Sequence, residues 1–147
     1  MRAIDLFSLK PVADAKGERM AQLLRTSAPS SASCIVPGAI LEAQFETAQG
    51  FLLFTTQDVP FEEQLDICLL APDMALRDRA TLAHAYTTGT FADCRIESDS
   101  SLTFRFFGTQ RLRIQLLDRP TWRLPWLGPA GVHRPLGMRR WFVVEVA

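Results

Sequence analysis

Arginine and tryptophan are concentrated in one stretch, residues 118–140, which reads DRPTWRLPWLGPAGVHRPLGMRR. Guanidinium groups bind carboxylates and phosphates through paired hydrogen bonds, and both residue types are common in binding hot spots. We therefore expect a protein partner or an anionic small molecule to bind here. The alternative is a lid that covers one end of the fold and carries solvated arginines. The candidate binding residues of this stretch are Trp122, Arg123, Trp126, His133, Arg134, Arg139 and Arg140.

A second group of arginines lies in residues 101–117, SLTFRFFGTQRLRIQLL. Apolar residues alternate on both sides of a three-residue loop at 108–110, which predicts a β-hairpin with one apolar face. In that register Arg105 lies directly opposite Arg113, and like charges so placed repel. Asp93 of the preceding strand is expected to pair with Arg105. The face is interpreted either as a solvated charge ladder or as a second binding face, because its arginines outnumber its acids.

The sequence lacks the spacings that mark many catalytic and metal sites. No P-loop, GxGxxG, HExxH, GxSxG or EF-hand pattern is present. The three cysteines are odd in number and lack CxxC spacing, which argues against a zinc site and a disulfide framework. Asp66, Asp78 and His84 have no metal-ligand spacing either. We expect no cofactor and no metal, and the balance favours a protein without catalytic activity.

Charge is unevenly distributed although the net charge is zero. Residues 42–99 hold eleven acids and three arginines, and residues 101–147 hold eight arginines and two acids. This asymmetry indicates either a surface for charged partners or two halves that pair with each other. The acidic middle and the zero net charge do not favour nucleic-acid binding. No stretch is apolar enough to cross a membrane or serve as a secretory signal, so a cytoplasmic protein is expected.

The elements that position these residues are predicted to be strands. Length and composition fit one globular domain over residues 1–147. Within it we expect an N-terminal arm and linker at 1–37, with a short helix at 17–26, and a β body at 38–147 with a long loop at 118–140. Residues 51–57 are apolar on both sides, which suits a central strand. Proline at 120, 125, 129 and 135 excludes a regular helix or central strand from the loop.

The predicted fold class is all-β, an antiparallel sandwich or small barrel of about eight strands with a short N-terminal helix. The predicted function is a non-enzymatic binding or protein-interaction module that uses the loop 118–140 and the adjacent arginine face. The alternative is a barrel that binds, or acts on, a small apolar or anionic ligand in its interior. A homodimer formed through the same surface is a third interpretation.

Overall fold

Thirteen strands form three antiparallel sheets in the computed structural model, which describes residues 1–14, 16–27, 33–135 and 137–147. The predicted all-β class and antiparallel pairing are confirmed, with thirteen strands in the described ranges where about eight were expected. The described residues contain no helix, so none that could span a membrane. The six-stranded sheet has the order β1 (Arg2–Ala3), β5 (Ile40–Thr47), β6 (Gly50–Thr56), β7 (Leu65–Leu70), β8 (Leu76–Leu82) and β12 (Val132–His133). The four-stranded sheet has the order β13 (Arg139–Val146), β11 (Arg111–Trp122), β10 (Ser101–Arg105) and β9 (Ala92–Ser98). The three-stranded sheet has the order β2 (Phe7–Pro11), β3 (Met20–Arg25) and β4 (Cys34–Pro37).

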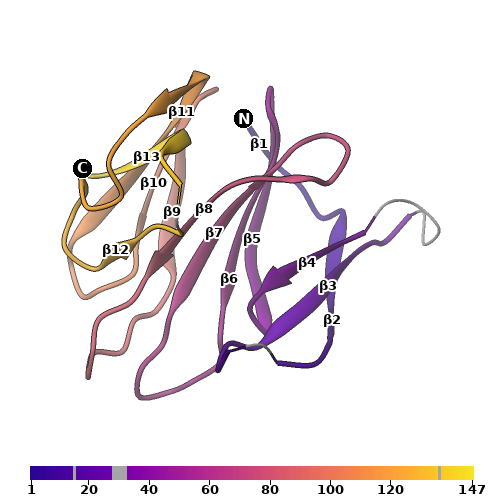
Figure 1. Ribbon diagram of the computed structural model, residues 1–147, viewed down its shortest axis with the longest axis horizontal. Coiled ribbons are helices and arrows are strands. Elements are labelled where there is room, and N and C mark those ends of the chain that lie inside the picture. Colours follow the sequence, from indigo (N-terminus) through magenta and orange to yellow (C-terminus); the bar gives the residue numbers. More distant parts are fainter. Residues whose placement is uncertain (15, 28–32, 136) are drawn as a thin grey trace.

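The six-stranded sheet is the middle layer, with the four-stranded sheet on one face and the three-stranded sheet on the other (Figure 1). Side chains alternate between the faces of a strand, so β6 sends Leu52 and Phe54 into the larger core and Phe51 and Leu53 into the smaller one. All seven residues of β6 are buried. The central position predicted for this segment is therefore confirmed, and its lack of polar alternation follows from burial on both faces.

The predicted N-terminal helix is wrong. Residues 20–25 form β3, which pairs with β2 and β4. Ala21 and Leu23 are buried, and this period of two places them under the three-stranded sheet, with Leu23 in the smaller core. A helix of this length is marginal alone, whereas pairing on both edges satisfies the backbone and buries Leu23. Of the predicted linker, residues 28–32 lie outside the described part of the chain.

The hairpin at 101–117 has the predicted apolar face but a different register. Leu102 pairs with Ile114 and Phe104 with Leu112, and all four enter the larger core. Arg105 faces Arg111 rather than Arg113, because the connection comprises residues 106–110 instead of 108–110. Every even slide keeps the same residues inward, so the apolar pattern sets the face but not the slide.

The loop expected at 118–140 is shorter than predicted. Strand β11 runs to Trp122, and its last residues pair with Arg139 and Arg140 at the start of β13. Pro120 is tolerated inside β11 because it lies in a register shift between Leu116 and Thr121, where regular ladder bonds are interrupted. The two-residue strand β12 divides the remaining connection and pairs with the edge of β8.

Candidate functional site

Trp122 at the end of β11 and Trp126 in the connection between β11 and β13 are both solvent-exposed. Trp122 is 72% exposed at the end of β11, and Trp126 is 74% exposed four residues later. Leu124, Leu127 and Met138 are exposed in the same connection. Its two ends are held together by a backbone hydrogen bond of 2.8 Å from Arg123 N to Met138 O. The connection therefore presents large apolar side chains to solvent from a tethered backbone.

Arg134 ties this connection to the body of the protein. Its side chain is 7% exposed, and Nη1 lies 3.1 Å from Asp78 Oδ1 of β8. Nη2 donates to Phe142 O at 2.9 Å, and the guanidinium lies 4.3 Å from the centre of the Phe142 ring. Burial lowers the pKa of Arg134 to about 10, with Asp78 opposing the shift, so the group stays cationic at neutral pH. Arg134 is thus occupied by internal partners.

Asp78 accepts the hydrogen bonds that join β8 to β13 and to Arg134. Its side chain is 2% exposed and receives N–H groups from Trp141 at 2.7 Å and Phe142 at 3.3 Å, besides the Arg134 guanidinium. These bonds connect β8 of the middle sheet with β13 of the four-stranded sheet. An aspartate among apolar residues of a strand is stable only with such partners, since an unpaired buried carboxylate is costly.

The remaining predicted residues of the connection divide by exposure. Arg123 and Arg139 are exposed, while Arg140 is 4% exposed and donates to the carbonyl oxygens of Gly137 and Arg139 at 2.8 and 3.2 Å. His133 in β12 is exposed, with Nε2 3.2 Å from Ala83 O. Arg140 therefore adds a buried positive charge next to Arg134, and Arg123 and Arg139 add solvent-accessible ones.

Two grooves flank the connection. The β13 groove, of about 490 Å³, lies between β13 and the segment 127–132, and is lined by apolar side chains with Arg123, Arg134 and Arg140. The Trp122 groove, of about 470 Å³, is lined by Leu76, Arg77, Trp122, Met138 and Arg139 among others. Apolar walls with a few charged groups are typical of binding sites for peptides and small ligands.

The predicted arginine face is only partly available. Arg105 forms an ion pair with Asp93, which confirms the predicted pairing, although its register partner in β9 is Ala92 because of a bulge. Arg113 is exposed on β11, opposite Thr103 on one side and Glu145 of β13 on the other. Arg113 thus lies on the outer face of the sheet whose edge borders the β13 groove.

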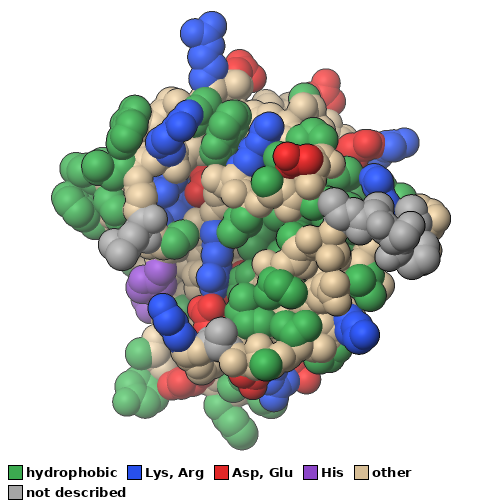
Figure 2. All heavy atoms as spheres, turned by 45° about the vertical axis from the view of Figure 1, so that its right-hand side comes forward, with side chains coloured by type: hydrophobic (Ala, Val, Ile, Leu, Met, Phe, Trp, Pro, Cys, Tyr) green, Lys and Arg blue, Asp and Glu red, His purple; other side chains and the backbone are tan. Residues whose placement is uncertain are grey.

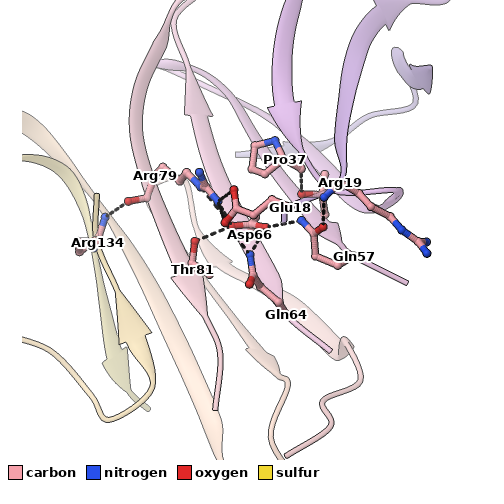
Figure 3. Close-up of polar contacts among 10 residues, drawn as sticks. Glu18, Arg19, Pro37, Gln57, Gln64, Asp66, Arg79, Thr81 and Arg134 are labelled. Atoms are coloured by element: carbon pink, nitrogen blue, oxygen red, sulfur yellow. Dashed lines mark hydrogen bonds and ion pairs between the residues drawn. The ribbon is translucent and has the colours of Figure 1, made fainter. Parts of the chain in front are cut away.

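A separate polar cluster surrounds Asp66, which is fully buried in β7 (Figure 3). Its Oδ1 accepts from Arg79 Nη2 at 2.8 Å and Thr81 Oγ1 at 2.6 Å, and Oδ2 accepts from Gln64 and Gln57 at 3.0 and 3.2 Å. Arg79 also bonds Glu18, which ties the segment before β3 to the middle sheet. A carboxylate with this many donors connects β7, β8 and the segments before β3 and β7.

Asp66, Asp78 and His84, which lack metal-ligand spacing in the sequence, do not come together in one site. Asp66 contacts Arg79 and Thr81 on one face of the middle sheet, and Asp78 contacts β13 on the other. Within the ranges that the structure describes, no group of three His, Cys, Asp or Glu side chains could hold a metal ion.

Sequence reasoning missed the role of Asp78 as a buried acceptor and the apolar wall formed by Leu127, Pro129 and Val132. One signal for Asp78 was present, since it interrupts the apolar alternation of residues 76–82. A charge in such a position indicates a buried partner elsewhere in the chain. The wall gave no signal, because it depends on where β12 places the segment.

Hydrophobic side chains protrude at the left and at the bottom of Figure 2, and basic side chains are dispersed over that view. Comparison with protein-family models, curated proteins and solved structures finds no match for this chain. Its function is therefore inferred from the geometry of its own residues.

Proposed function

We propose that the protein is a non-enzymatic binding module whose partner docks on the connection between β11 and β13. The observation that carries the proposal is the exposure of Trp122 and Trp126, 72% and 74%, on a backbone fixed by internal ion pairs and hydrogen bonds. Exposed tryptophans on an ordered segment are the anchors that dominate many protein interfaces. A partner that covers them removes their apolar surface from water at little cost in ordering.

The exposed arginines give the surface its preference for charge. Arg123 and Arg139 border the two grooves, and Arg113 lies on the adjoining face of the four-stranded sheet. None of the three forms an ion pair with another described residue. A partner with carboxylates or phosphates would complement them, as arginine binds such groups through two hydrogen bonds. The favoured partner is an acidic protein surface, with an anionic small molecule as the alternative.

Site-specific photo-crosslinking tests this proposal. A photoreactive phenylalanine analogue replaces Trp126 in one variant, and Tyr86, which is 93% exposed elsewhere, in a matched control. Both are expressed in the cells that make the protein and irradiated. We expect discrete adducts at position 126, reduced by Arg123→Glu, and absent at position 86. The same adducts at both positions, or none at 126, would contradict the proposal.

A further inference from the structure

Strand β13 has one edge that no other strand of the described residues covers. It pairs with β11 alone in the four-stranded sheet. Ala147 N donates to Arg111 O at 3.0 Å, and bonded pairs alternate along an antiparallel ladder. The N–H and C=O groups of Phe142, Val144 and Val146 therefore point away from β11, toward the free edge.

Within the described ranges, side chains bond the first half of this edge and leave the second half open. Phe142 O accepts from Arg134, and Phe142 N donates to Asp78. Among the described residues, no donor or acceptor bonds the outward groups of Val144 and Val146. Natural sheets usually protect such edges, because unpaired backbone groups accept a further strand. The protected half therefore ends at Phe142, and the open half comprises Val144 and Val146.

The β13 groove runs along the open half. It takes in Val143 to Val146 on one side and Leu127, Pro129 and Val132 on the other. Residues from both faces of β13 line it, so the groove follows the edge and not one face. Four residues of extended chain span roughly 13 Å. The length and the volume of about 490 Å³ suit a short extended peptide.

The charges of the groove favour an acidic peptide. Arg140 is buried and bonds only carbonyl oxygens, and no carboxylate of the described residues lies within ion-pair distance of it. Arg123 is exposed at the same groove. Glu145 is the acidic residue of the lining, against three arginines. A buried guanidinium without a carboxylate gains from one brought by a ligand.

We propose that the open half of β13 binds an extended peptide segment of a partner protein, which adds as a fifth strand to the four-stranded sheet and places an acidic side chain near Arg123 and Arg140. This deepens the proposed function and rests on it, since it names the binding mode and the chemistry of the partner. A second copy of this chain fits less well. The β13 edge of a second copy lies beside its own residues 127–132, and these two walls would keep the two edges from pairing.

Selection from a displayed library of random linear peptides on the full chain tests this binding mode. We expect enriched peptides to alternate apolar and polar residues and to carry Asp or Glu. For a synthetic peptide from that pool, Val146→Pro, which removes one outward N–H, should weaken binding about tenfold or more. Val146→Ala keeps the N–H and should bind nearly as the wild type. Arg123→Glu should also weaken binding about tenfold, while Arg95→Glu on β9 should not.

Amide hydrogen exchange provides a readout that requires no variant to fold. Bound peptide should slow exchange at Val144 and Val146. Failure to enrich any peptide, equal binding by Val146→Pro, or unchanged exchange would overturn the proposal. A wild-type dimer in sedimentation that Val146→Pro dissociates would assign the edge to a second copy instead. If position 126 crosslinks a partner and Val146→Pro leaves the yield unchanged, the binding module stands and the edge site falls.

Discussion

Replacing either member of the buried Asp78–Arg134 pair should destabilise the protein, and the two replacements should differ. Arg134→Met leaves a buried carboxylate that still accepts N–H groups from Trp141, Phe142 and Arg79. Asp78→Ala leaves a buried guanidinium without its carboxylate. It also leaves the N–H groups of Trp141 and Phe142 without an acceptor. Aspartate at position 78 is thus the more costly loss.

The expected magnitudes follow from the contacts. Breaking a buried ion pair by removing one partner costs about 3–5 kcal/mol of unfolding free energy. Arg134→Met should cost about 3 kcal/mol, because Asp78 keeps three backbone donors. Asp78→Ala should exceed it by about 2 kcal/mol, since an unsatisfied buried N–H costs about 1–3 kcal/mol. The double variant should cost less than the sum of the single variants, because neither charge is then left alone.

Urea unfolding followed by far-ultraviolet circular dichroism measures these differences. With a denaturant slope of about 1–3 kcal/mol per molar for a protein of this size, the two midpoints should differ by roughly 1 M. If Asp78→Ala does not fold, Asp78→Asn takes its place, since its amide oxygen still accepts one N–H. Equal midpoints, or a larger loss for Arg134→Met, would show that the backbone donors do not depend on Asp78.

Three further outcomes are expected. Gly50→Ala should strongly destabilise the protein or abolish folding, since Gly50 has φ +128° and an added Cβ would lie 2.0 Å from a carbonyl oxygen of β7. Thermal unfolding measures this effect, and a loss of unfolding free energy below about 1 kcal/mol would contradict it. A double-mutant cycle of Asp93→Asn and Arg105→Gln should give a coupling of about 0–1 kcal/mol, because both side chains are partly solvated; a coupling above about 2 kcal/mol would refute this. Burial raises the pKa of the Cys68 thiol far above its usual range and raises that of Cys94 to about 11. Iodoacetamide labelling of the native protein at pH 8, read by mass spectrometry, should therefore spare Cys68 and modify Cys94 slowly.

Which residues face the cores could be predicted from the sequence, whereas the register between paired strands could not. The apolar face of the hairpin at 101–117 and the central place of residues 51–57 followed from side-chain period alone. The register of the hairpin could not be predicted in this way. Phe106 enters the core from the connection between β10 and β11, and its ring lies so close to Gly89 that a side chain at position 89 would not fit. That contact joins segments far apart in the chain and leaves no trace in local periodicity.

The N-terminal error has a related cause. Met20, Leu23 and Leu24 fit a helical period, and Ala21 with Leu23 fits a strand period equally well in so short a run. The choice was made by the middle sheet, whose second apolar face needs cover from β2, β3 and β4. The predicted sandwich or barrel has a single core and therefore needs no third layer, whereas the protein has two cores.

The arginines of residues 118–140, which the sequence offers as one group, differ in their surroundings: Arg134 is held by internal partners, whereas Arg123 and Arg139 are exposed. Arg134 covers the first half of the β13 edge and fixes the connection, so replacing it would disturb the surface whether or not a partner touches it. Replacing Arg123 or Arg139 breaks no ion pair of the described residues, so such variants test the proposed binding separately from stability. A charge-reversal experiment that combines Arg134 with Arg123 would therefore confuse loss of structure with loss of recognition. Variants of Arg123, with Arg95→Glu as the matched control, separate the two effects.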